Sequence, residues 1–168
     1  MSLSLLDRPD DTGSAGRRDD HNEDRGLTGA AVPAPDLSAG RPAEVSPPAS
    51  RVLVVDDTAS IRTEIRYLLE EAGLEVVGEA SHGAEGVMLT RELRPDVVVM
   101  DVRMPILDGI AATGYITREL PDIRVIVFSA FDDQELEDAA RAAGASRFLT
   151  KGISPTAIAA AVRDAAGA

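Results

Sequence analysis

The sequence predicts a doubly wound α/β sandwich over residues 51–168, in which a parallel sheet is covered by helices on both faces. Apolar runs at 52–55, 97–100 and 125–128 lack the alternation of apolar and polar positions that a strand with one solvent-facing side shows. Segments with apolar residues at helical spacing lie between such runs. Predicted strands and helices therefore alternate along the chain, which is typical of an α/β fold with a parallel sheet.

The first half of this domain is predicted to hold three strands and two helices. They are strand 52–55, helix 61–72, strand 75–80, helix 84–93 and strand 96–100. Gly73 ends the first helix as a C-terminal cap. The second helix ends before Pro95, because a proline disfavours helical geometry in the residue that precedes it.

The second half continues the same alternation. The elements are helix 108–120, strand 124–128, helix 136–143, strand 146–149 and a last helix that begins at 154–155. Gly114 weakens the first of these helices by about 1 kcal/mol relative to alanine. Ser154 and Pro155 form a favourable helix start, with a capping hydroxyl before a first-turn proline.

Residues 1–50 differ from the rest of the chain in composition. Gly, Pro, Ser, Ala, Asp and Arg dominate, and nine acidic residues against five arginines give a net charge of −4. Such a segment buries too little apolar surface to offset the entropy of ordering. We therefore predict a disordered N-terminal extension, either a plain extension or a tail that docks a partner.

Composition also limits the partners and the location. The formal charge of −12 argues against nonspecific binding to nucleic acid or to an anionic membrane. The absence of cysteine excludes disulfides and thiolate metal sites. No signal peptide opens the chain, and no apolar run approaches the roughly 18 residues of a membrane span. We expect a cytoplasmic protein.

Polar side chains follow four of the five predicted strands at the point where each strand ends. They are Asp56 and Asp57, Asp101, Ser129 and Lys151. The carboxyl ends of parallel strands meet at one edge of the sheet, where such folds bind their ligands. We therefore expect these side chains to converge on one pocket.

Three carboxylates within about 5 Å of one another repel by roughly 3 kcal/mol per pair at an effective dielectric constant near 20. Such a cluster requires a cation, and Mg²⁺ suits an all-oxygen site. Lys151, the only lysine in the chain, adds a compact positive charge that can contact a phosphoryl oxygen. A cation, a carboxylate, an ammonium and a hydroxyl together suit phosphoryl transfer to Asp101, aided by Lys151 and Ser129.

These motifs resemble the receiver domain of bacterial two-component response regulators over about residues 51–166. The matching residues are Asp56-Asp57, Asp101, Met104-Pro105, Asp108-Gly109, Ser129-Ala130 and Phe148-Leu149-Thr150-Lys151. The resemblance implies a CheY-like, flavodoxin-like (βα)5 fold with strand order 2-1-3-4-5. It also implies a signalling switch rather than an enzyme, phosphorylated on Asp101 by a sensor histidine kinase or a histidine phosphotransfer protein.

The resemblance further implies roles for individual residues. The ligands implied for Mg²⁺ are Asp56, Asp57, Asp101 and the backbone carbonyl of Arg103. Ser129 would move onto the phosphoryl group, and Phe148 would turn inward with it. The surface formed by helix 136–143, strand 146–149 and the last helix would then change its contacts with a downstream protein or with a second copy.

Three features depart from the family pattern. Gly152 stands where most receivers have proline, which leaves open whether the Lys151–Gly152 peptide is cis. The long segment before residue 51 is unusual, and no output domain is visible before Ala168. Residues 152–155 nevertheless resemble the NarL/FixJ subgroup, whose members carry a DNA-binding helix-turn-helix. The chain is therefore expected to be a stand-alone receiver or the receiver half of a DNA-binding regulator.

Other hypotheses stay open. A haloacid dehalogenase-type phosphatase also forms an aspartyl phosphate, but it needs an acid two residues after the nucleophile, where this chain has Arg103. A degenerate receiver would never be phosphorylated, but Asp57, Asp101 and Lys151 are intact. His21 and His82 lack ligand partners at the spacing of a zinc site.

Each site residue also has an ordinary structural explanation. The Asp56-Asp57 pair could begin a helix, Ser129 could be a loop residue, and Lys151 could be a solvated charge. Phe148 could simply pack in the core. Asp108 is expected to cap the helix that follows it.

Overall fold

A computed structural model describes residues 49–167, and the predicted extension at 1–50 lies almost wholly outside this range. Within it, five strands alternate with five helices along the chain. The elements are β1 (Arg51–Val55), α1 (Ala59–Glu71), β2 (Glu75–Ala80), α2 (Gly83–Leu93), β3 (Val97–Asp101), α3 (Gly109–Glu119), β4 (Arg124–Ser129), α4 (Gln134–Ala142), β5 (Arg147–Thr150) and α5 (Pro155–Ala166). No helix in the described range is long and apolar enough to cross a membrane.

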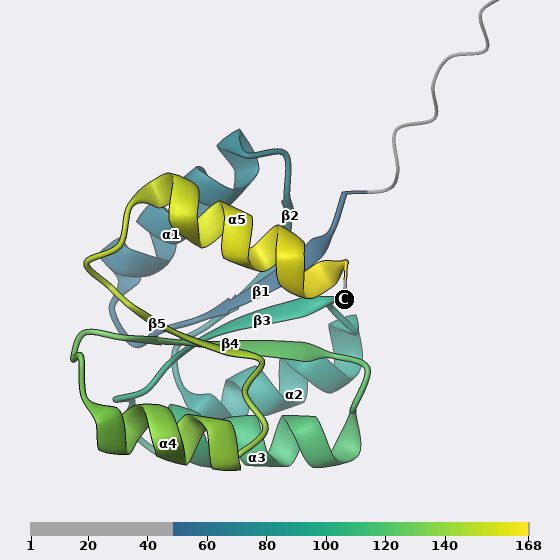
Figure 1. Cartoon of the computed structure of the whole chain (residues 1–168). Coiled ribbons are helices and arrows are strands. Elements are labelled where there is room, and N and C mark those ends of the chain that lie inside the picture. Colours follow the sequence, from purple (N-terminus) through teal and green to yellow (C-terminus); the bar gives the residue numbers. More distant parts are fainter. Residues whose placement is uncertain (1–48, 168) are drawn as a thin grey trace, which may run out of the picture. The chain divides into compact units, whose positions relative to one another are not determined.

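The five strands form one parallel sheet in the order β2-β1-β3-β4-β5, as expected from the sequence. Helices α1 and α5 cover one face, and α2, α3 and α4 cover the other (Figure 1). All strands run in the same direction, so their carboxyl ends lie along one edge. The doubly wound (βα)5 architecture is confirmed.

Burial on both faces explains the unbroken apolar runs of the central strands. Val52 and Val54 of β1 pack in the cluster under α1 and α5. Their neighbours Leu53 and Val55 pack in the cluster under α2 and α3. Successive side chains of a strand point to opposite faces, so every position of β1 after the first meets an apolar layer.

The strand and helix boundaries differ from the predicted ones by one or two residues. β3 extends to Asp101 and β4 to Ser129, because both residues continue the ladder and pair with Phe128 and Thr150 respectively. α4 begins two residues early, because the Asp133 carboxylate caps it by accepting from the backbone N–H of Glu135.

The α4–β5 side of the sheet is packed less tightly than its centre. Ala140 is the only fully buried residue of α4, and no residue of β5 is fully buried. The apolar cluster here has three buried members, Val102, Val127 and Ala140, with half-buried side chains around them. This region therefore has fewer buried contacts to hold it in place.

Candidate functional site

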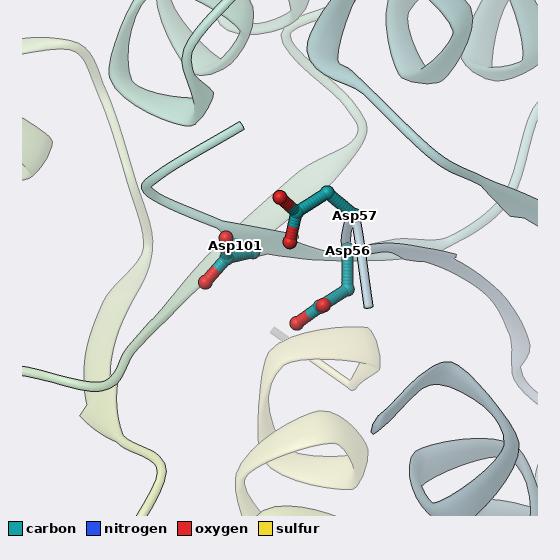
Figure 2. A group of neighbouring side chains, drawn as sticks. All are labelled: Asp56, Asp57 and Asp101. Carbon is teal, nitrogen blue, oxygen red and sulfur yellow. The ribbon is translucent and has the colours of Figure 1, made fainter. Parts of the chain in front are cut away.

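Three aspartates converge where β1 and β3 end side by side (Figure 2). Asp56 and Asp57 follow β1, and Asp101 is the last residue of β3. One carboxylate oxygen from each lies within 4.8 Å of the other two. Asp56 and Asp101 are only 1% and 6% exposed, whereas Asp57 faces solvent. The cluster is therefore a buried pair of acids with one open side.

Asp56 is held by its backbone as well as by its side chain. Its carboxylate accepts from the backbone N–H of Thr58 at 2.8 Å. Its carbonyl accepts from the Arg62 guanidinium at 2.6 Å, and its N–H donates to the carbonyl of Ala80 at 3.1 Å. The N-cap of α1 is Thr58, so capping alone does not account for the position of the two acids.

Gly109 permits the tight turn behind Asp101. A Cβ at this position would lie 1.8 Å from the carbonyl oxygen of Asp101. This distance is too short for any residue with a side chain. The Gly109 N–H donates to the carbonyl of Val102 at 2.9 Å. The Asp108 carboxylate accepts from the N–H of Ala111 at 2.9 Å, so the prediction that Asp108 caps the helix is confirmed.

The loop between Asp101 and α3 contains an unusual backbone conformation. Ile106 has a φ of +70°, a left-handed value that is rare for a β-branched residue. The N–H of Leu107 donates to the carbonyl of Pro105 at 2.8 Å, so Ile106 is the centre of a three-residue turn of a strained kind. Its side chain is 80% exposed.

Lys151 reaches into the acidic cluster from the end of β5. Its Nζ lies 2.6 Å from Oδ2 of Asp56 and 2.7 Å from Oδ1 of Asp101. The side chain is 17% exposed, so it is a half-buried partner of two carboxylates rather than a solvated charge. The peptide bond to Gly152 is trans, as are all others in the described range.

Burial and ion pairing act in opposite senses on the pKa of each of these two groups, and both pKa values end up raised. Burial raises the pKa of Asp101, and the repulsion from Asp56 adds to this, while Lys151 offsets only part of the shift. Burial by itself would lower the pKa of Lys151, but the hydrogen bonds to Asp101 and Asp56 outweigh it and raise that pKa. The ammonium therefore stays charged at neutral pH beside a carboxylate that is costly to ionise.

Ser129 lies at the same edge, but its hydroxyl is hydrogen-bonded to the loop that follows β4. The residue is 1% exposed, and its Oγ accepts from the backbone N–H of Phe131 at 3.1 Å. Its carbonyl accepts from the N–H of Lys151 at 2.7 Å, which joins the ends of β4 and β5. Ser129 is thus a buried strand residue, not a mobile loop residue.

The two remaining predicted residues lie at the margins of the site. Arg103 is exposed, and its guanidinium carbon lies 4.2 Å from the centroid of the Phe131 ring. Phe148 is half-buried against the small apolar cluster on the α4 side and lines a cavity of about 270 Å³ between α4 and β5. Their implied roles as metal ligand and switch remain predictions.

Sequence reasoning missed several residues that shape this edge. Arg62 binds the Asp56 carbonyl, and Phe131 engages both Ser129 and Arg103. His82 caps α2, with its Nδ1 accepting from the N–H of Glu85 at 3.1 Å. Only His82 carried a sequence signal, because Glu85 follows it at capping-box spacing and binds back to Ser81.

The donor set fits a hard divalent cation. Each of the three carboxylates offers an oxygen, and Mg²⁺ is usually held by one or two carboxylates while it keeps several waters. Asp57 is exposed, so solvent reaches this side of the cluster. A cation would also favour the ionised form of Asp101, whose pKa is raised by burial and, to a smaller extent, by repulsion from Asp56.

Comparison with known proteins agrees with this geometry. The family model of the response regulator receiver domain matches residues 52–163. The response regulator GacA of Pseudomonas aeruginosa is 45% identical over 103 residues, which cover 61% of this chain and 48% of GacA. The chain thus spans about half the length of that relative. The chemotaxis protein CheY of Thermotoga maritima is 42% identical over 106 residues, or 63% of this chain and 88% of CheY.

Solved structures give the same result. The response regulator domain of Thermotoga maritima CheB has a TM-score of 0.66 at 34% identity, covering 71% of this chain and 98% of that domain. The CheX-CheY-BeF3-Mg²⁺ complex of Borrelia burgdorferi has a TM-score of 0.65 at 26% identity, covering 68% of this chain and 87% of the matched one. The chain therefore belongs to the response regulator receiver domain family, the phosphorylation-dependent signalling switches of two-component systems.

Proposed function

We propose that Asp101 accepts a phosphoryl group from a sensor histidine kinase or a histidine phosphotransfer protein in the cytoplasm. One observation carries this proposal: the Lys151 ammonium contacts Asp101 at 2.7 Å, in a pocket shared with Asp56 and Asp57. A carboxylate oxygen of Asp101 forms the new bond to phosphorus. The P–N bond of the donor breaks, and its electron pair leaves on the imidazole nitrogen.

Each neighbouring residue has a distinct task in this step. Lys151 exchanges part of its pairing with Asp101 for a phosphoryl oxygen and thereby stabilises the charge that the transfer brings in. Ser129 turns its hydroxyl toward the same group, which requires its Oγ to give up the bond from Phe131. Asp56 remains a partner of Lys151 and keeps the ammonium oriented.

Mg²⁺ is the cofactor that we propose for this site. Its ligands would be Asp56, Asp57, Asp101 and the backbone carbonyl of Arg103. When bound, it would neutralise oxygen charges of the phosphoryl group. The support is the three-carboxylate cluster, together with a structural relative whose complex contains Mg²⁺ and BeF3.

Phosphorylation would be transmitted to the α4–β5–α5 surface. The new group adds about −1.5 to −2 charges, draws Ser129 inward and leaves space for Phe148 to turn in. The support is the loose packing of this side, where Phe148 lines a cavity of about 270 Å³. A downstream protein or a second copy of the chain would recognise the changed surface.

Labelling with a small phosphodonor tests the site assignment. Acetyl phosphate and Mg²⁺ should add one phosphoryl group to the wild type, measured by intact mass, and chelation of Mg²⁺ should prevent it. Asp101→Asn should abolish the labelling. Asp108→Asn is the matched control, because an asparagine retains the helix cap and should label normally. Equal labelling of Asp101→Asn would contradict the proposal.

A second candidate is the receiver half of a longer DNA-binding regulator. The observation that favours it is the match to about half of GacA, whereas the match to most of the Thermotoga CheY favours a stand-alone switch. The reading frame beyond codon 168 distinguishes them. An in-frame helix-turn-helix would support the longer regulator.

A further inference from the structure

Arg103 and Phe131 connect the two loops that flank the proposed phosphorylation site. Arg103 lies two residues after Asp101 in the loop after β3, and Phe131 lies two residues after Ser129 in the loop after β4. The guanidinium carbon stands 4.2 Å from the ring centroid, well within the range of a cation–π contact. Within residues 49–167, this guanidinium forms no ion pair with a carboxylate.

Phe131 is engaged at both its side chain and its backbone. Its ring lies under Arg103 although the residue is 47% exposed. Its N–H donates to the buried Oγ of Ser129 at 3.1 Å. A single residue therefore links the loop after β3 to the hydroxyl that the proposed function requires to move.

We propose that the Arg103–Phe131 contact is a latch that holds Ser129 in the unmodified arrangement and slows phosphoryl acceptance at Asp101. This inference rests on the proposed function, in which Ser129 turns toward the phosphoryl group. For that turn, Oγ must lose the N–H of Phe131, so the segment that carries Phe131 has to adjust. The contact with Arg103 resists this adjustment, which makes the Arg103 side chain a positioning group.

A purely electrostatic role for Arg103 predicts the opposite effect. A positive charge near the site would attract an anionic phosphodonor, so its removal would slow the reaction, most strongly at low salt. Removal of a latch accelerates the reaction and depends little on salt. The sign of the rate change therefore separates the two roles.

The rate of labelling by acetyl phosphate with Mg²⁺ measures this sign. Phe131→Leu and Arg103→Gln should each accelerate labelling about two- to fivefold, the effect of losing one exposed cation–π contact. Arg103→Lys, which keeps the charge, should lie between these variants and the wild type. Arg118→Gln is the matched control, since Arg118 lies over Tyr115 on α3, with 5.6 Å from the guanidinium carbon to the ring centroid. Slower labelling, or the same change in the control, would overturn the latch.

Combined variants test whether the three residues act as one unit. Arg103→Gln together with Phe131→Leu should accelerate labelling no more than either change alone, because both break the same contact. In a Ser129→Ala background neither change should accelerate labelling, because no hydroxyl is left to hold. Additive effects, or acceleration without Ser129, would contradict the inference.

Hydrogen exchange at the Phe131 amide tests the latch without any phosphodonor. The N–H to Oγ bond should open more often in Arg103→Gln, so the amide should exchange about two- to fivefold faster. Arg118→Gln should leave it unchanged, and unchanged exchange in Arg103→Gln would refute the latch. If the wild type accepts no phosphoryl group, the proposed function fails, but this measurement still decides whether the latch exists.

Discussion

The β1–β3 centre of the sheet and its α4–β5 side differ in packing and in what they contribute to the site. All five residues of β3 are buried, whereas β5 has none that is fully buried. The centre places Asp56 and Asp101 and fixes the loop behind them with the close approach of Gly109. The α4–β5 side contributes Phe148, which is predicted to move. The fixed carboxylates thus belong to the dense region, and the side chain that is predicted to turn inward, Phe148, belongs to the loose one.

Lys151 links the two regions. It follows β5, the least buried strand, yet its ammonium pairs with acids that end β1 and β3. One side chain therefore connects the densely packed centre to the loosely packed side of the sheet. Changes at Lys151 should have the largest consequences.

Lys151→Met should lower the free energy of unfolding by about 3 kcal/mol in Mg²⁺-free buffer, because it leaves two buried carboxylates without a counter-charge. Added Mg²⁺ should restore part of this loss. Urea unfolding with and without Mg²⁺ measures both effects. Arg147→Met is the matched control, since Arg147 on β5 forms an exposed pair with Asp164 that should contribute less than about 0.5 kcal/mol. Equal losses of unfolding free energy in both variants would show that the Lys151 pairs are no more important for stability than an exposed ion pair.

Gly109→Ala should destabilise the fold by about 2 to 3 kcal/mol, because the new methyl group would overlap the carbonyl of Asp101. Gly152→Ala is the counterpart in the loop after β5. A methyl group at Gly152 would meet nothing within 4 Å, so its effect should stay within about 0.5 kcal/mol. Thermal unfolding of the two variants compares the two loops directly. Similar melting temperatures would show that the loop after β3 is no more constrained than the loop after β5.

Asp101→Asn should stabilise the metal-free protein by roughly 1 kcal/mol at pH 7. Burial raises the pKa of Asp101, so the folded protein retains this proton to a higher pH than the unfolded chain does. The wild type therefore loses stability, relative to the variant, as the pH rises from the ordinary carboxyl value through the raised one. Below pH 3.8 the difference should vanish. Chemical unfolding across this pH range measures the difference in unfolding free energy between the two proteins. If the wild type gained stability relative to Asp101→Asn as the pH rises, the prediction would be wrong.

Ile106→Gly should stabilise the fold by about 0.5 to 1 kcal/mol, the smallest effect of the series. Glycine adopts the φ of +70° without the strain that a β-branched residue carries, and the 80% exposed side chain leaves no cavity. Differential scanning calorimetry detects the shift. A loss of stability would mean that the Ile106 side chain contributes contacts that outweigh its strain.

The fold and the charged centre of the site follow from local sequence patterns. The apolar run that ends in Asp101 predicts both a buried strand and the edge at which it stops. Because a parallel sheet brings such ends together, the acids and Lys151 could be placed in one pocket from the sequence alone. Element boundaries were less exact, since Asp133 and His82 set helix starts through caps that periodicity does not reveal.

Contacts between loops could not be predicted in the same way. The Arg103–Phe131 contact joins two loops whose paths depend on tertiary packing, and neither residue belongs to a periodic pattern. The left-handed Ile106 contradicts the preference of its residue type, so only the surrounding hydrogen bonds explain it. These are the positions where the global fold overrides local preference.

Because Lys151 is the chain's only lysine, amine chemistry has a single side-chain target, which sits between two carboxylates. An amine that remains protonated is a poor nucleophile, so acylating reagents should modify the amino terminus and spare this residue. Any event that draws a carboxylate away would expose it to them. The extent of acylation at Lys151 would then report how often its ammonium separates from the carboxylates of Asp56 and Asp101.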